Sequence, residues 1–163
     1  MNIKVKRLDH TAKLPSQKHD DDFCYDLVAT KRRHIGLFLW EYETGLAMQI
    51  DRGIEPIEST NSLVYSGVDF NKSYIKLSLD IRPRSSIKDT GFVLCNSTGT
   101  IDEGYTGPIK LYFYHVLPWK RPYRVGDKIG QVKLGMSFPL QFCEVQELDK
   151  TARGDGGFGS TGK

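Results

Sequence analysis

The sequence lacks the features that identify several classes of protein. It has only three cysteines, Cys24, Cys95 and Cys143, and no C-x-x-C pair, so neither a zinc ribbon nor a disulfide framework is indicated. No apolar run approaches the length of a transmembrane helix. The first residues, MNIKVKRLD, alternate apolar and charged side chains, unlike the apolar core of a signal peptide. We therefore expect no membrane partner and a cytoplasmic, reduced compartment, which would be the host's if the gene is viral.

Sustained helical periodicity is also missing, since no helical pattern persists beyond about two turns. Alternation of apolar and polar residues is frequent instead, most clearly in YIKLSLDI at 74–81. The ranges 109–117, 128–134 and 140–148 are further predicted strands, and turns that carry glycine or proline separate them. Many short strands joined by such turns predict an all-β fold, either a sandwich, a distorted β-barrel or a jelly roll.

The composition is that of an ordinary globular domain. The 163 residues are 39% hydrophobic and 26% charged, and the net charge of +3 neither requires nor excludes a polyanionic partner. Two regions differ from the rest. The segment 31–74 begins with Lys-Arg-Arg and contains the apolar patch GLFLW, whereas 151–163 holds five glycines and a single large apolar side chain. We expect one β domain over residues 1–150 and a flexible C-terminal arm over residues 151–163.

The arm carries groups that suit a nucleotide. Glycine backbone N–H groups can close around an anion, and Arg153 adds a planar bidentate donor for phosphate. Ser160 and Thr161 add hydroxyls, and Phe158 offers a flat face for a base. A plain flexible linker is the alternative. Against the linker, an arginine, an aromatic ring and two adjacent hydroxyls occur together in a very short segment.

Two other segments combine groups that bind phosphate or activate water. In RPRSS, residues 82–86, two arginines flank a proline directly before two serines, a combination that binds phosphate, although a solvated surface turn fits as well. In GTIDEGYTGPI, residues 99–109, Asp102 and Tyr105 lie in a turn punctuated by glycines, shortly after Asn96. An aspartate in such a loop can act as a general base that orients a water. A hairpin turn is the simpler alternative.

Two weaker segments complete an ordered set. YDLVA at 25–29 and GDKIGQV at 126–132 each indicate a strand edge and a turn, with Asp26 able to bond a metal's waters and Gln131 able to bond a phosphate. In chain order the set is YDLVA, PRSS, N-x-x-G-T-I-D-x-G-Y-x-G, G-D-x-I-x-Q and R-G-x-G-G-F-G-S-T-G. This set resembles the five motifs of the homotrimeric dUTP pyrophosphatases, the dUTPases, from about Phe23 to the C-terminus.

The resemblance implies a fold, an assembly and a reaction. Members of the family fold as a β jelly roll and form a homotrimer with three sites. Each site takes motifs from all three chains, and the C-terminal arm of one chain closes over a nucleotide held between the other two. The reaction converts dUTP and water to dUMP and pyrophosphate, and Mg²⁺ is bound mainly by the triphosphate.

The resemblance also implies residue roles. Asp102 matches the aspartate that orients the water attacking the α-phosphorus, and Tyr105 matches the ring that packs under the deoxyribose and excludes a ribose 2′-hydroxyl. Asp26 corresponds to an aspartate near the metal's water shell, so no residue is expected to bind the metal directly. The other expected substrate-binding residues lie in four motifs, as follows: Asn96 and Gly99 in the uracil segment, Arg84, Ser85, Ser86 and Gln131 toward the phosphates, and Arg153, Phe158, Gly159, Ser160 and Thr161 in the arm.

The chain departs from the family pattern in its first half. The stretch between Asp26 and Arg84 is roughly twenty residues longer than the family leads us to expect, and we place the excess within 31–74. The GLFLW patch at 36–40 would then cover a trimer edge, bind a protein partner, or pack as an extended hairpin on its own barrel, which is the simplest interpretation. Gly130 also replaces the commoner alanine of the fourth motif.

Two other functions stay open. The long segment is compatible with a nucleotide-responsive regulatory protein on a dUTPase scaffold, alone or beside catalysis. A dCTP deaminase shares the fold but usually lacks the Phe-Gly-Ser arm. Nucleic-acid binding is not expected, because the basic runs Lys31-Arg32-Arg33 and Trp119-Lys120-Arg121 are short and solvated loops explain them.

Overall fold

The computed structural model describes residues 2–52, 64–65, 68–69, 75–154 and 156. Within these ranges the chain forms eleven strands, one short 3₁₀-helix and no α-helix. The elements are β1 (Asn2–Arg7), β2 (Tyr25–Val28), β3 (Lys31–His34), β4 (Leu39–Asp51), β5 (Val64–Tyr65), β6 (Val68–Asp69), β7 (Lys76–Arg82), η1 (Ser85–Asp89), β8 (Phe92–Leu94), β9 (Gly99–Asp102), β10 (Pro108–His115) and β11 (Lys128–Ser137).

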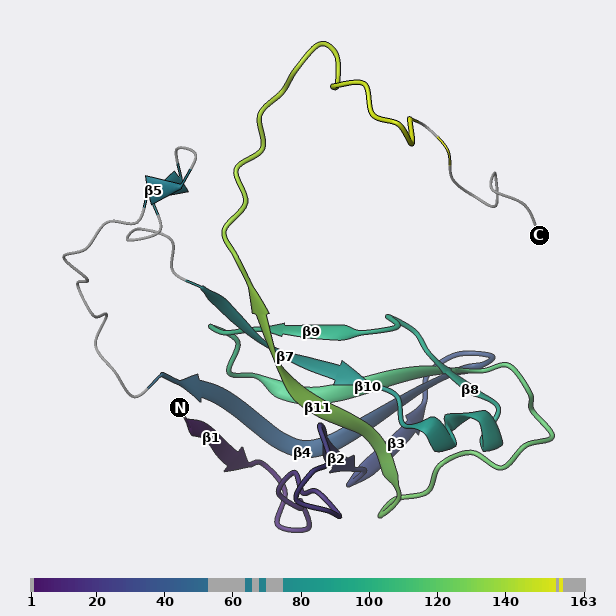
Figure 1. The fold of residues 1–163 in the computed structure, drawn as a ribbon. Helices are drawn as coiled ribbons and strands as arrows, with labels where there is room; N and C mark the ends of the chain where they lie inside the picture. Colours follow the sequence, from purple (N-terminus) through teal and green to yellow (C-terminus); the bar gives the residue numbers. More distant parts are fainter. Residues whose placement is uncertain (1, 53–63, 66–67, 70–74, 155, 157–163) are drawn as a thin grey trace.

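Two antiparallel sheets make up the body of the molecule (Figure 1). The five-stranded sheet has the order β1-β4-β10-β8, with β3 also pairing with β4. The four-stranded sheet has the order β2-β11-β7-β9, and β5 and β6 pair with each other. This arrangement confirms the predicted all-β class.

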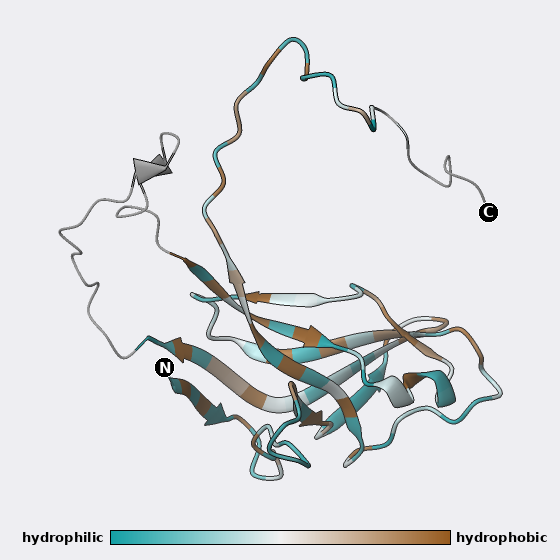
Figure 2. Cartoon of the chain, in the orientation of Figure 1, coloured by the Kyte–Doolittle hydropathy of each residue, from teal (hydrophilic) through white to brown (hydrophobic). Residues whose placement is uncertain are grey.

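The core lies between the two sheets and is formed by the apolar residues that alternate with polar residues along the strands. In β7 the side chains of Leu77, Leu79 and Ile81 are buried while their neighbours are more exposed. Strand β10 contributes Ile109, Leu111 and Phe113 in the same way. Figure 2 shows the resulting change from hydrophobic to hydrophilic along the strands. Burial of each such side chain contributes about 1.5–3 kcal/mol to folding. The two segments predicted as strands from the sequence are β7 and β10, and both lie in the interior of their sheets.

The predicted strand at 140–148 is wrong, because this part of the chain forms no ladder within the described residues. After β11 ends at Ser137 the chain leaves the body as an extended segment (Figure 1). Its apolar side chains face solvent, with Leu140 at 73% and Phe142 at 90% exposure. A strand needs a partner strand to satisfy its backbone groups, and 138–150 pairs with none in the described part of this chain.

The segment 31–51 is an integral part of the five-stranded sheet. Strands β3 and β4 form a hairpin whose tip is closed by a hydrogen bond from the Ile35 amide to the Leu39 carbonyl, 2.9 Å. Trp40 packs against Tyr42 in the core, while Leu37 at the tip is 82% exposed. The GLFLW patch therefore lies in a hairpin, as the simplest interpretation expects, whereas a role at a trimer edge or toward a protein partner stays a prediction. The rest of the long segment, apart from Arg52, β5 and β6, lies outside the described residues.

The three cations that begin this hairpin each have an acceptor. Lys31 lies 3.4 Å from Asp9, and Arg33 lies 2.9 Å from the buried carboxylate of Glu41. Arg32 donates to the Tyr123 carbonyl at 2.8 Å and lies over the ring of Trp40. Charges that already have partners attract polyanions less strongly than free ones.

Candidate active site

Asp26 on β2 is a buried carboxylate that accepts hydrogen bonds from three distant side chains. Its Oδ1 accepts from Nε of Arg84 at 2.9 Å and from Nε2 of Gln131 at 3.3 Å. Its Oδ2 lies 2.7 Å from Nζ of Lys128. Burial raises the pKa of Asp26, but the hydrogen bond from Lys128, the charge of Arg84 and the hydrogen bond from Gln131 together lower it more. The carboxylate is therefore ionised at neutral pH.

The order of the four-stranded sheet brings these residues together. Strand β11 lies between β2 and β7, and Gln131 is the register partner of both Asp26 on one side and Arg82 on the other. Arg84 follows two residues after β7 ends, in extended conformation. The segments YDLVA, RPRSS and GDKIGQV thus meet at one end of the sheet, as a single cluster.

Lys128 is a member of this cluster that the sequence did not predict. In a regular strand, side chains three residues apart point to opposite faces, so Lys128 and Gln131 would be separated. A register shift between Lys128 and Gly130 interrupts the pairing of β11 with β2, and both side chains then reach Asp26. A register shift cannot be recognised from the alternation of apolar and polar residues, so the sequence did not indicate that Lys128 reaches Asp26.

Arg84 is oriented for a second partner. Its Nε is bonded to Asp26, and its Nη1 lies 3.5 Å from Oγ of Ser86 in η1. The side chain is 29% exposed, so part of it reaches solvent, and the hydroxyl-bearing residues Ser85 and Ser86 follow it directly in the chain. A guanidinium held on one side by a carboxylate can bind a phosphate with its free N–H groups.

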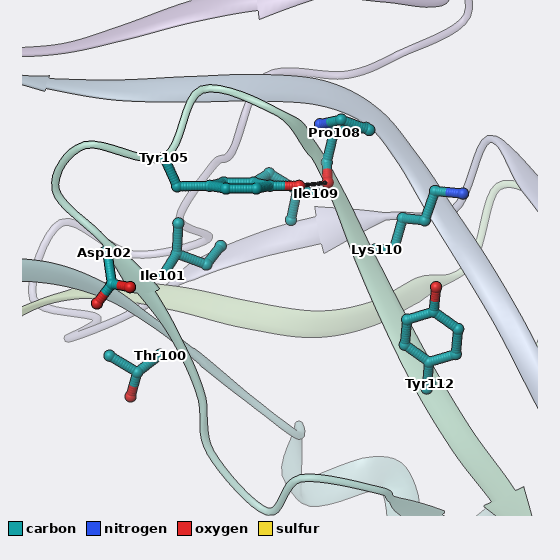
Figure 3. Close-up of a pocket in the computed structure, with 8 residues that line it drawn as sticks. All are labelled: Thr100, Ile101, Asp102, Tyr105, Pro108, Ile109, Lys110 and Tyr112. Atoms are coloured by element: carbon teal, nitrogen blue, oxygen red, sulfur yellow. Dashed lines mark hydrogen bonds between the residues drawn. The ribbon is translucent and has the colours of Figure 1, made fainter.

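Asp102 and Tyr105 line a second, separate cavity of about 430 Å³. Figure 3 shows its lining residues, which come from β9, the following turn and β10: Thr100, Ile101, Asp102, Tyr105, Pro108, Ile109, Lys110 and Tyr112. The Tyr105 amide donates to the Asp102 carbonyl at 2.9 Å, and the Tyr105 hydroxyl donates to the Pro108 carbonyl at 3.1 Å. A Cβ at Gly107 would lie 2.5 Å from that hydroxyl oxygen. The tyrosine ring is therefore folded over its own turn, and Gly107 leaves room for it.

Asn96 and Gly99 line a smaller adjoining pocket of about 90 Å³ between β9 and β10. Asn96 folds over Gly99, since a Cβ at that position would lie 2.8 Å from the Asn96 Nδ2. Strand β9 is the edge of its sheet, and the described pairing of β10 with β8 covers only residues 113–115. Backbone groups of the two strands consequently face this pocket without a ladder between them, which suits a ligand with its own donors and acceptors.

The two clusters lie far apart within one chain. Asp102 is the register partner of Ser78 near the start of β7, whereas Arg84 lies beyond the other end of that strand. At about 3.3 Å per extended residue, the six residues from Ser78 to Arg84 span roughly 20 Å. A triphosphate is much shorter, so one triphosphate cannot contact both clusters of the same chain.

Part of the predicted arm lies within the described residues. Nε of Arg153 donates to the Gly156 carbonyl at 3.0 Å, and Arg153 is exposed. The roles expected for Phe158, Gly159, Ser160 and Thr161 fall on residues outside the described ranges, so they stay predictions, as does the division at residue 150.

The described residues offer no metal site built from protein ligands alone, since no three or more of their His, Cys, Asp or Glu side chains group to hold an ion. A magnesium ion bound chiefly through phosphate oxygens, with protein contact through water, fits this donor set. The portions of the chain that the structure covers also contain no helix with the length and apolarity to span a bilayer.

Comparison with protein families and curated proteins gives consistent matches. The dUTPase family model matches residues 43–162. The deoxyuridine 5'-triphosphate nucleotidohydrolase of Wolinella succinogenes is 31% identical over 167 residues, which cover 100% of this chain and 95% of that protein. The corresponding protein of Alkaliphilus metalliredigens is 32% identical over 164 residues, with 99% and 97% covered.

Solved structures share the fold. The dUTPase of Staphylococcus bacteriophage 80alpha with dUpNHpp has a TM-score of 0.71 at 19% identity, and 99% of each chain is covered. The dUTPase of the S. aureus phage phi11, whose structure visualises a species-specific insert, has a TM-score of 0.64 at 17% identity, with 93% and 100% covered. A mutant of the phi11 enzyme coordinates a structural Mg(II) ion.

Proposed function

This chain belongs to the dUTPase family and is a dUTP diphosphatase, and from that premise we propose how its residues convert dUTP and water to dUMP and pyrophosphate. The observation that carries the proposal is that Asp102 and Tyr105 line one cavity beside the pocket of Asn96 and Gly99. The base, the sugar and the attacked phosphorus then take adjacent positions along these strands.

The uracil ring binds in the pocket between β9 and β10. Its edge pairs with backbone groups of the segment that contains Asn96 and Gly99, because these strand edges are not joined by a ladder there. A uracil edge held this closely by backbone groups of a small pocket leaves little space for the methyl group of thymine. The deoxyribose lies against the ring of Tyr105, where a 2′-hydroxyl would collide with it.

Asp102 acts as the general base. Its exposed carboxylate lies at the end of β9 and takes a proton from a water as that water attacks the α-phosphorus. The new bond joins the water oxygen to phosphorus, and the bond to the bridging oxygen breaks. Pyrophosphate leaves with the electrons of that bond, and dUMP remains.

The Asp26 cluster binds the phosphates. Arg84, Ser85 and Ser86 supply a guanidinium and hydroxyls, and Gln131 supplies an amide donor. Asp26 would hold Mg²⁺ through its water shell, and the ion, when bound, neutralises charge on the triphosphate and stabilises the leaving pyrophosphate. The direct contacts of Asp26 give it a further task, which is to fix Arg84 and Gln131 in place.

The C-terminal arm closes the site. Phe158 stacks on uracil, while Arg153, Ser160 and Thr161 contact the outer phosphates and Gly159 allows the backbone to approach closely. Closure of such an arm excludes water and completes the set of phosphate contacts.

The active assembly is a homotrimer in which different chains supply the two clusters. The roughly 20 Å between Asp102 and Arg84 supports this, since a triphosphate cannot span it. The exposed apolar side chains of residues 138–148 support it as well. A groove of about 510 Å³ runs beside β1 and β11, and it is lined by Ile3, Val5, Leu14, Pro15, Tyr25, Met48, Leu79, Val132, Lys133 and Leu134. The extended segment of a neighbouring copy fits such a groove.

A nucleotide panel tests the activity. Purified protein is given dUTP, dCTP, dTTP or UTP with magnesium, and both pyrophosphate and ammonia are measured. We expect pyrophosphate from dUTP with little from the others, and no ammonia from dCTP. Ammonia release would favour the deaminase, and the absence of any turnover of dUTP would favour a purely regulatory protein.

A further inference from the structure

Arg52 makes an unusual set of contacts at the end of β4. Its Nη2 donates to Oε2 of Glu103 at 2.7 Å, and its Nε donates to the other oxygen of the same carboxylate. Nη2 also donates to the backbone carbonyl of Ile75 at 2.8 Å. One guanidinium therefore joins three chain segments, and two of its bonds form a planar fork that fixes direction as well as distance.

Glu103, which accepts these paired hydrogen bonds, is next to the predicted catalytic base Asp102. Glu103 directly follows Asp102 and lies in the turn that leads to Tyr105. Within the turn, the Tyr105 amide bonds to the Asp102 carbonyl, but that contact is local. Gly104 has open space on its Cβ side. Besides the bond of the Tyr105 hydroxyl to Pro108 at the start of β10, the Glu103 side chain ties this turn to the ends of β4 and β7 through Arg52.

Arg52 also connects the two sheets where the turn emerges. It follows β4 of the five-stranded sheet, and Ile75 precedes β7 of the four-stranded sheet. Asp102 pairs with Ser78 near the start of β7. The paired hydrogen bonds between Arg52 and Glu103 thus help to fix the direction of the chain as it leaves β9 at Asp102.

We propose that Arg52 is a positioning residue of the reaction, which holds the Asp102–Tyr105 turn through Glu103. The proposal rests on the proposed role of Asp102 as general base. The side chains of Arg52 and Glu103 are 38% and 32% exposed, so solvent screens the pair and its contribution to folding should be modest. Its effect should appear in the rate, since small misplacement of a catalytic group is costly.

Steady-state kinetics with dUTP test this assignment. Arg52→Ala and Glu103→Gln should each lower kcat/KM by about tenfold or more, mainly through kcat, with little change in Tm. Arg52→Lys should restore little, because one ammonium cannot form the fork. The charge-swapped pair Arg52→Glu with Glu103→Arg should recover part of the loss, and the two single changes should be non-additive.

The matched control is Lys4→Ala. It removes another exposed ion pair at the same end of β4, Lys4 to Asp51 at 3.0 Å, without touching the turn, and should leave kcat/KM unchanged. The inference is overturned if Arg52→Ala and Glu103→Gln retain kcat/KM within about twofold of the parent protein, or if activity falls only in parallel with Tm and the swap recovers nothing. An inactive parent protein would instead refute the proposed function.

Discussion

The carboxylate of Asp26 accepts a hydrogen bond from Nε of Arg84 over 2.9 Å, although 58 residues separate the two in the chain. The same carboxylate takes a 2.7 Å contact from Lys128. These bonds hold Arg84 from one side, which leaves its other N–H groups for a phosphate. Asp26 therefore orients donors that we propose bind the phosphates of the substrate.

Asp26→Asn should weaken both binding and folding. Two cations lose their counter-charge, so the KM for dUTP should rise about tenfold, and the free energy of unfolding near neutral pH should fall by about 1.5–3 kcal/mol, as for hydrogen bonds to charged groups. Kinetics and urea titration measure the two effects. The matched control is Asp89→Asn, which removes a contact between two exposed side chains at 2.8 Å and should change neither quantity.

The stability difference should depend on pH. Because its pKa is lowered in the folded protein, ionised Asp26 contributes fully above the unfolded pKa of about 4. That contribution is lost as the pH falls through the folded value. The gap in unfolding free energy between the parent and Asp26→Asn should shrink from about pH 7 toward about pH 3. A gap that stays constant across this range would contradict a charged Asp26.

Asp102→Asn should separate catalysis from binding. The amide cannot accept the proton of the attacking water, so kcat should fall by about 10²- to 10⁴-fold. Binding of a non-hydrolysable dUTP analogue, measured by calorimetry, should change little, because the phosphate-binding cluster is untouched. Near-normal turnover in this variant would remove Asp102 from the role of base.

Tyr105 should control the choice between dUTP and UTP through its ring. Tyr105→Ala removes the surface against which a 2′-hydroxyl collides, so the preference in kcat/KM for dUTP over UTP should fall by about tenfold or more. Tyr105→Phe keeps the ring and loses only the 3.1 Å bond to the Pro108 carbonyl, so it should keep most of the preference. Equal discrimination in the alanine variant would place the selectivity elsewhere.

Gly130 should not tolerate the alanine that is commoner in its motif. A Cβ there would lie 2.6 Å from Cδ2 of the buried Leu111 and 3.2 Å from the Arg82 carbonyl. Gly130→Ala should therefore cost about 1–3 kcal/mol of unfolding free energy, as overpacking does. Adding Leu111→Val should recover part of it, and Gly104→Ala, with open space around it, should cost little. An alanine at 130 that leaves Tm unchanged would contradict the close approach of Leu111 to this position.

The strands that form the core could be predicted because their pattern is local. Leu77, Leu79 and Ile81 alternate with polar residues, and a strand of that pattern buries one face whatever its partner is. The segment 140–148 has a comparable apolar content, but strand formation also depends on a partner strand, and this segment pairs with none within the described residues. The same pattern therefore predicted one strand correctly and the other wrongly.

The site residues could be predicted only where a motif contains them. Asp102 and Tyr105 occur in such a motif, and the structure places both on one cavity. Lys128 was missed because a register shift turns it toward Asp26. Arg52 was missed because its partner lies 51 residues away and neither residue stands out in the sequence.

Mixed assemblies should reveal which chain supplies each part of the site. One parent carries Asp102→Asn, and the other lacks residues 151–163. Each parent alone should lose about 10²-fold or more in kcat. If a site combines the base of one chain with the arm of another, co-expression should restore activity, because some sites then contain an intact Asp102 and an intact arm. A site formed within a single chain could not be restored in this way, since every chain would lack one of the two.

Differently tagged subunits, purified in tandem and assayed for pyrophosphate release, distinguish these outcomes. Mixed trimers as inactive as both parents would contradict the shared site.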